Sequence, residues 1–284
     1  MTALFDMIHQ MFSFSFMVRA IVVGLLVTLC AALLGVNLVL KRYAMIGTAL
    51  SHVGFAAYAI YGVIAQMIVG TVSSLAVSMP IVIGAAFLLL RLNENSKIKG
   101  DSAVAFVSTS SLAIGIIIVS MTTGITLHIC NILFGSIFAM TQADMYLSIV
   151  LSIVVVGLFV LFYKQLFAVT YDESFAKATG TKVELYKSLL AILTAITVVL
   201  GMRMMGALLI AALTLFPALT AMRLCKRFLS VVITAAVVGV VCFFVGMLFS
   251  YGLDLPPGAS VVGVNLIVFA AFSCIAAIRR GGTA

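Results

Sequence analysis

The stretch FMVRAIVVGLLVTLCAALLGVNLVLKRYAMIGTALSH, residues 16–52, decides the fold class of this chain. Positions 20–40 carry no charge, and a helix needs about 20 apolar residues to cross the hydrocarbon core of a bilayer. Lys41 and Arg42 then interrupt the run, and a second apolar segment follows. The stretch predicts two membrane-spanning helices joined by a short turn.

The whole chain has the composition of a membrane protein. Of its 284 residues, 64% are hydrophobic and only 8% are charged, whereas about a quarter of residues are charged in an ordinary soluble domain. The formal net charge is +8, but the basic residues lie singly or in pairs at the ends of apolar runs, which is typical of topology signals and not of a nucleic-acid surface. Residues 1–284 are therefore expected to form a single, all-α, polytopic transmembrane domain.

Apolar runs recur along the chain with short polar breaks between them. They predict nine transmembrane helices, near 18–40, 43–67, 71–91, 103–121, 145–163, 186–201, 205–222, 228–250 and 260–278. The sixth and seventh of these are separated by very few residues.

The distribution of Lys and Arg predicts the orientation, because cytoplasmic loops carry an excess of both. With nine spans and the N-terminus outside, only Arg19 and Arg203 face outward and the C-terminus is cytoplasmic. With eight or ten spans, Lys and Arg would no longer be concentrated on one side of the membrane. Residues 1–16 are then an extracellular interfacial segment, and no cleaved signal peptide is indicated. The expected cytoplasmic residues are Lys41, Arg42, Arg91, Lys97, Lys99, Lys164, Lys177, Lys182, Lys187, Arg223, Lys226, Arg227, Arg279 and Arg280.

Residues 164–187 form the longest polar segment, on the predicted cytoplasmic side. Within it, DESFAKATG (172–180) predicts a short helix: Thr170 or Asp172 can cap its start, Glu173 suits the positive end of its dipole, and Gly180 can supply a left-handed residue after its end. Two interpretations are open. The helix rests on the lipid surface, or it docks a soluble cytoplasmic partner.

His52 lies deep in the second predicted span. An ionisable group at that depth is a functional-site hypothesis by default, and Thr48 and Ser51 place further polar atoms near it. Three roles are open: a neutral histidine hydrogen-bonded to a neighbouring helix, with Thr48 and Ser51 bonded to carbonyls of their own helix; a metal ligand; or a proton relay. A relay normally needs a second titratable group at depth, and none is evident.

Several functions find no support in the sequence. Ser51 and His52 are adjacent on a helix and cannot form a nucleophile–base pair, and no GxSxG or HExxH motif is present. The absence of a GxxxxGK[ST] motif means that any ATP-driven step needs another polypeptide. No Asp or Glu lies inside a predicted span, which weakens a proton- or sodium-coupled secondary transporter. The five cysteines are scattered without CxxC spacing, and no permanently bound cofactor is expected.

Taken together, several ordered stretches resemble the ABC-3 family, the permease subunits of bacterial ABC transporters for zinc, manganese or iron(II). Residues 16–52 are similar to the first span of that family and the turn into its Ser-His motif. The other matching stretches are GDSAVAFVSTSSLAIGIIIVS (100–120), LHICNILFGSI (127–137), YDESFAKATGTKVE (171–184), GMRMMGALLIAALTLFPALTAMRL (201–224) and DLPPGASVVGVNLIVF (254–269).

This resemblance implies a multi-pass permease of the bacterial cell membrane that is not itself an enzyme. A second permease chain, the same or related, would complete the pore, two cytoplasmic ATPase subunits would hydrolyse ATP, and an extracellular metal-binding protein would deliver the ion. The segment with Asp172, Glu173, Phe175, Ala178 and Gly180 would couple the ATPase to the pore. Zinc and manganese are the expected ions, with iron possible.

The resemblance also implies the metal site. The family has an Asp and, four residues later, a His in the second helix; His52 matches the histidine, but Thr48 occupies the aspartate position. Ala56 and Ala57 stand where the family usually carries Pro-Gly, which puts in doubt the kink that would open this helix around the site. Three hypotheses fit: a softer, His-preferring ion such as zinc, a heterodimer whose other permease supplies the carboxylate, or lost selectivity. Met45, Met204, Met205, His128 and Cys130 are weaker candidate ligands.

Two further classes remain as alternatives to an ABC permease. One is an ion- or proton-coupled secondary metal transporter that works without an ATPase. The other is a membrane scaffold or sensor that transports nothing. The DESFAKATG segment distinguishes an ABC permease from a secondary transporter, because only an ATP-driven permease needs it to bind an ATPase. His52 distinguishes a transporter from a scaffold or sensor, because only a transporter needs it for metal flux.

Overall fold

The computed structural model describes residues 13–67, 74–95, 100–121 and 142–281. The regular structure in these ranges is entirely helical, which confirms the predicted fold class. Residues 1–12, His128, Cys130, Lys97 and Lys99 lie outside the described residues. The helices are α2 (Ser15–Leu40), α3 (Ala44–Met67), α4 (Ser74–Asn95), α5 (Gly100–Met121), α7 (Gln142–Leu161), α8 (Tyr163–Tyr171), α9 (Glu173–Ala178), α10 (Val183–Met205), α11 (Ala207–Leu224), α12 (Phe228–Leu253) and α13 (Pro257–Gly281).

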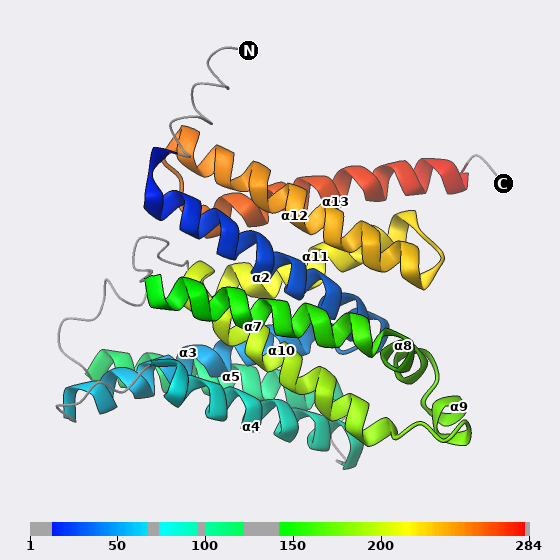
Figure 1. The fold of residues 1–284 in the computed structure, drawn as a ribbon, viewed down its shortest axis with the longest axis horizontal. Coiled ribbons are helices and arrows are strands. Elements are labelled where there is room, and N and C mark those ends of the chain that lie inside the picture. The colour runs from blue at the N-terminus through cyan, green and yellow to red at the C-terminus, as the bar shows by residue number, and fades with distance from the viewer. Residues whose placement is uncertain (1–12, 68–73, 96–99, 122–141, 282–284) are drawn as a thin grey trace.

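Within the described residues, eight helices are long and apolar enough to cross a membrane, or nine if α7 and α8 count as one bent span. Each predicted span corresponds to one helix, with ends displaced by a few residues. The predicted closeness of the sixth and seventh spans is confirmed, because Gly206 alone separates α10 from α11. Its φ of 84° is one that residues with a side chain rarely adopt, which allows the chain to reverse direction there (Figure 1).

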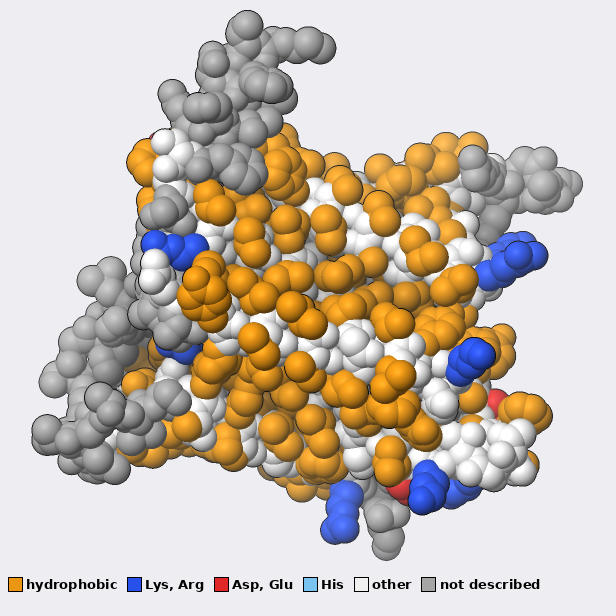
Figure 2. Space-filling model, viewed as in Figure 1, with side chains coloured by type: hydrophobic (Ala, Val, Ile, Leu, Met, Phe, Trp, Pro, Cys, Tyr) orange, Lys and Arg blue, Asp and Glu red, His pale blue; other side chains and the backbone are white. Residues whose placement is uncertain are grey.

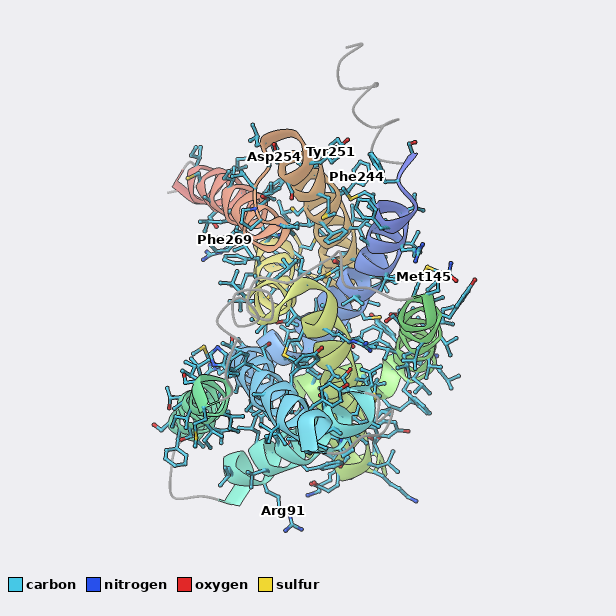
Figure 3. All side chains as sticks on the ribbon, turned by 90° about the vertical axis from the view of Figure 1, so that its left-hand side faces the viewer. Arg91, Met145, Phe244, Tyr251, Asp254 and Phe269 are labelled. Atoms are coloured by element: carbon cyan, nitrogen blue, oxygen red, sulfur yellow. The ribbon has the colours of Figure 1, made fainter. Side chains whose placement is uncertain are left out.

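The helices run across Figure 1 between two ends, with α8 and α9 together at one of them. α2 is the most buried candidate span and packs against α7, α10, α11 and α12. α3 packs against α4, α5, α10 and α11. Seen from the end opposite α8 and α9, α5 and α7 lie on opposite sides of the bundle (Figure 3). The helices α10 and α11 therefore join a group around α2 to a group around α3.

The surface carries a broad hydrophobic band between two ends that hold the basic side chains (Figure 2). Lys and Arg side chains are more numerous at the end with α8 and α9 (Figure 2). Large exposed apolar residues on α5, α7, α12 and α13 contribute to the apolar surface, among them Phe106, Val160, Ile233 and Ile267. A bilayer satisfies such a surface, which would be an aggregation hazard in water. That the α8–α9 end is cytoplasmic stays a prediction.

Glycines let the central helices approach closely, as small residues do in membrane bundles. A Cβ built at Gly35 in α2 would lie 2.0 Å from the carbonyl oxygen of Thr214 in α11, and one built at Gly47 in α3 would lie 2.8 Å from the Thr214 hydroxyl. Thr214 therefore packs against glycines of two helices at once. This contact fixes the start of α3, next to Thr48, against α11.

We expect Gly35→Ala to destabilise the protein markedly. The added methyl group would meet a backbone oxygen, which cannot rotate away, so α2 and α11 would have to separate; overpacking of this kind typically costs about 1–3 kcal/mol. Gly157→Ala on α7 is the matched control, because a methyl group added there would meet nothing within 4 Å. Thermal unfolding of the purified protein in detergent measures both. Equal melting temperatures for the two variants would contradict the close packing of α2 against α11.

Candidate functional site

His52 lies on α3 well inside the hydrophobic band. The turn before α3 contains Arg42, whose backbone is left-handed with φ 61°, and the helix starts at Ala44. At about 1.5 Å of rise per residue, His52 is about 12 Å along the axis. Thr48 lies one turn earlier, and both side chains are half-buried. The two residues thus occupy one side of α3 at membrane depth.

The imidazole of His52 is held by α5. Its Nδ1 lies 2.7 Å from the hydroxyl Oγ of Ser108, which is within hydrogen-bond distance. When Nδ1 carries the proton and donates to Ser108, the lone pair of Nε2 is free to bind a metal ion. Ser108 is the one hydrogen-bond partner of the ring among the described residues. The contact fits both a structural histidine and a ligand held in position by its neighbour.

The other candidate residues on these helices, Ser51 and three methionines, lie in different surroundings. Ser51 donates to the carbonyl of Gly47 in its own helix at 2.8 Å and is fully buried, as expected for a structural serine. Met205 is buried, and its terminal methyl would lie 2.6 Å from a Cβ at Gly24, so it packs α10 against α2. Met45 is 54% exposed near the start of α3. None of the three adds a donor next to His52, and Met204 lies in the last turn of α10.

α3 continues without a break past the site. It is one helix from Ala44–Met67, and Ala56 and Ala57 are buried in it. A Cβ on Gly115 of α5 would lie 2.6 Å from the Phe55 ring and 3.2 Å from the Cα of Ala56. The backbone of α5 therefore lies directly against the stretch where a Pro-Gly pair would interrupt the helix. α3 and α5 form one packed unit that carries His52.

Within the part of the chain that the structure describes, no group of three or more His, Cys, Asp or Glu side chains could hold a metal ion. Zinc and related ions commonly take three or four protein ligands. His52 and Thr48 alone would therefore be an incomplete ligand set for such an ion.

The second predicted site, the segment around α9, lies where α7 ends. α8 turns away from α7 by 68°, and the short helix α9 follows. The Oδ1 of Asp172 accepts hydrogen bonds from the backbone N–H groups of Ser174 and Phe175, at 2.9 and 3.0 Å, so the predicted cap is Asp172. Thr170 instead belongs to α8 and donates to Asn37 Oδ1 at 3.0 Å. Gly180 is left-handed with φ 80°, as predicted.

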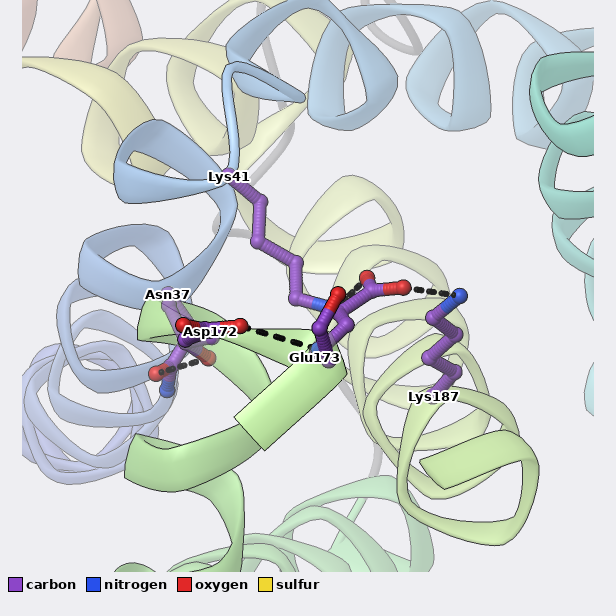
Figure 4. Close-up of polar contacts among 7 residues, drawn as sticks. Asn37, Lys41, Asp172, Glu173 and Lys187 are labelled. Atoms are coloured by element: carbon purple, nitrogen blue, oxygen red, sulfur yellow. Dashed lines mark hydrogen bonds and ion pairs between the residues drawn. The ribbon is translucent and has the colours of Figure 1, made fainter. Parts of the chain in front are cut away.

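Glu173 ties α9 to two other helices through ion pairs (Figure 4). Its Oε1 lies 2.9 Å from Lys41 Nζ and its Oε2 lies 2.6 Å from Lys187 Nζ. Burial alone would raise the pKa of Glu173, but the hydrogen bonds and charges of Lys187 and Lys41 outweigh it and lower this pKa below its ordinary value. The stabilisation by these pairs is therefore complete above the ordinary pKa and is lost as the pH falls through the lowered one.

The remaining face of α9 is exposed. Ala176 is fully buried against Val169 of α8 and Val183 of α10, whereas Phe175 is 63% exposed and Ala178 is exposed. Aromatic residues, phenylalanine among them, are enriched at protein–protein interfaces. α9 is thus fixed to the bundle on one face and available on the other.

These features can be compared with known proteins. Residues 13–276 match the profile of the ABC 3 transport family. The chain belongs to this family.

Relatives from several bacteria are similar over nearly their whole length. The manganese transport system membrane protein MntC of Halalkalibacterium halodurans is 29% identical over 271 residues, covering 95% of this chain and 89% of that protein. A probable iron transport system membrane protein of Haemophilus influenzae is 30% identical, covering 94% and 96%. A chain of the solved structure of PsaBC from Streptococcus pneumoniae in complex with Fab superposes with a TM-score of 0.83 at 26% identity, covering 96% and 95%.

The predicted site residues of this chain fall into two groups in the structure. The structure brings His52 and Thr48 to one side of α3 and gathers Asp172, Glu173, Phe175, Ala178 and Gly180 around α9. It adds Ser108 and the two lysines, which the sequence did not single out. Ser108 is one of several hydroxyl residues in its span, so the sequence does not mark it as the neighbour of His52. Lys41 and Lys187 are basic residues near the ends of apolar runs, like those that set the topology, so the sequence does not mark them as partners of Glu173.

Proposed function

We propose that the chain is the membrane-spanning permease subunit of an ATP-binding cassette importer for divalent transition metal ions. The match to the ABC 3 transport family over residues 13–276 carries this proposal. The helical bundle, with enough apolar helices for eight or nine spans in its described residues, provides the pore-forming part of such a machine. Its place is the bacterial cell membrane.

Manganese and iron(II) are the ions that the relatives favour, because their names specify manganese or iron transport. His52 and Thr48 would border the path of the ion. Without the carboxylate that the family places at position 48, a site with His52 offers an imidazole and a neutral hydroxyl, which supports zinc as the third candidate. The ion is the cargo of the protein, and we assign no resident cofactor.

A second permease chain would complete the pore. His52 is only half-buried, and the described residues hold no group of three His, Cys, Asp or Glu side chains that could bind an ion, so a facing chain that brings its own pair of donors would satisfy the ion. A homodimer would supply two histidines and two threonines. A heterodimer with a related permease would restore a carboxylate.

Separate cytoplasmic subunits would hydrolyse ATP and bind the exposed face of α9. An extracellular metal-binding protein would deliver the ion to the opposite end. Family membership favours this assembly over a secondary transporter that works without an ATPase. The test is reconstitution with the ATPase subunits in proteoliposomes and parallel uptake of manganese, iron(II) and zinc with and without ATP; uptake that is equal without ATPase would overturn the proposal.

Phe175→Ala should weaken binding of the ATPase by about tenfold or more, because truncating an aromatic hot spot typically costs about 2 kcal/mol or more. Ala178→Trp on the same face should act similarly by steric exclusion. The matched control is Tyr146→Ala, since Tyr146 on α7 is 64% exposed, close to the 63% of Phe175, but lies outside the α8–α9 region. Co-purification of the ATPase with tagged permease measures the effect. Retention of ATPase by both α9 variants would contradict the docking role.

A further inference from the structure

The ion pairs of Glu173 connect parts of the chain that are far apart in sequence. Lys41 directly follows the end of α2 and lies 132 positions from Glu173, whereas Lys187 lies in the second turn of α10. Both lysine side chains are nearly buried, at 5% and 8% exposure, while Glu173 is 41% exposed. Breaking a pair that holds a nearly buried charge is costly, because the remaining charge is left uncompensated. The three side chains should therefore move together.

Lys41 also stands at the entry to the helix with the candidate metal site. The turn after it is well defined: the Lys41 N–H donates to Asn37 O, and the Tyr43 N–H donates to Leu38 O at 2.8 Å. α3 begins three residues after Lys41, and His52 follows within that helix. A displacement of the Lys41 side chain is thereby passed to the first turns of α3 over a short, hydrogen-bonded connection.

Apolar packing of α9 does not reach the turn between α2 and α3. The single buried residue of α9, Ala176, packs with Val169 and Val183, which belong to α8 and α10. Beside the ion pairs lies a small cavity of about 20 Å³, lined by Lys41, Lys187, Ile46 and Leu50 among others. Ile46 and Leu50 belong to the first two turns of α3. A cavity of this size holds about one water molecule, so the packing of α3 against α10 is incomplete beside the ion pairs.

We propose that Lys41 transmits movement of α9 to α3, so that docking and ATP-driven closure of the ATPase reposition the helix that carries His52. This inference rests on the proposed function and names the residue through which that function would be regulated. Lys41 is a positioning residue, because it acts through Glu173 and α3 and touches neither the ion nor the ATPase. Lys187 anchors Glu173 to α10.

The test compares metal ions taken up per ATP hydrolysed in proteoliposomes that contain the complete transporter. Lys41→Met should lower this ratio by about tenfold or more while ATP hydrolysis continues, and Lys41→Arg should restore most of it, because the charge is retained. Glu173→Gln should lower the ratio at least as much as Lys41→Met, because it removes the contact with Lys41 and also the contact with Lys187. Lys226→Met, at an exposed position between α11 and α12, should leave the ratio unchanged.

The ratio separates transmission from mere loss of stability. If Lys41→Met reduced uptake and ATP hydrolysis in parallel, the ratio would stay constant and the inference would be wrong. A wild-type ratio in Lys41→Met would also overturn it. Absence of ATP-dependent uptake by the unmodified complex is a different result, which would refute the proposed function itself.

Discussion

His52→Ala should reduce metal uptake at low ion concentration by about 100-fold or more. Loss of a residue that only supports a metal ligand typically costs about 10–100-fold in affinity, and His52 is the proposed ligand itself. Its imidazole is half-buried beside α5, so alanine would leave space without supplying a donor. Uptake of manganese by the reconstituted transporter, measured across ion concentrations, gives the apparent affinity.

Ser51→Ala is the matched control, because Ser51 is adjacent on the same helix but its hydroxyl donates to the Gly47 carbonyl of that helix. It should transport like the wild type. Ser108→Ala should have an intermediate effect, because it leaves the imidazole in place but removes the hydroxyl 2.7 Å from Nδ1. Normal uptake by His52→Ala would show that His52 is a structural residue and would support the scaffold or sensor alternative.

Thr48→Asp should raise the apparent affinity for manganese by about tenfold or more, equivalent to about 1.4 kcal/mol. A carboxylate provides a charged oxygen that offsets the desolvation of a dication, whereas a hydroxyl provides a neutral one. Thr48 is half-buried one turn from His52, so an aspartate there can reach the same ion. The preference among ions should shift from zinc toward manganese, because manganese favours oxygen ligands more strongly.

Thr48→Asn tests whether the charge is responsible, because asparagine matches aspartate in size and shape but carries no charge. It should leave the affinity near that of the wild type. If Asp and Asn variants behaved alike, the effect would come from packing. If neither differed from threonine, position 48 would not border the ion path.

Much of the fold could be predicted from the sequence because a bilayer imposes one dominant requirement. Each spanning segment must be apolar for about 20 residues and must satisfy its backbone hydrogen bonds internally. The nine predicted spans therefore match nine helical segments of the described chain, and the narrow break at Gly206 follows from the spacing of two of them. The cap at Asp172 and the left-handed Gly180 could likewise be predicted, because both depend on local backbone chemistry.

The partners of individual polar residues could not be predicted in this way. Hydroxyl residues are frequent in the span that forms α5, and only the packing of α3 on α5 selects Ser108 as the neighbour of His52. The pairing of Glu173 with Lys41 and Lys187 depends on how α8 bends away from α7 and brings α9 beside the end of α2. Bends and packing of this kind arise from many weak contacts between distant segments.

The sequence alone thus determined that the chain is a helical membrane bundle with a short capped helix in its longest polar segment and an isolated histidine at depth. These properties depend on hydropathy, spacing and local hydrogen bonding, all of which act within about one helical turn or one span. Only the tertiary structure decided that Glu173 joins α9 to α2 and α10 and that Ser108 holds the imidazole of His52. Side chains 56 and 132 positions apart meet only after helices pack, and that packing is cooperative across the whole bundle.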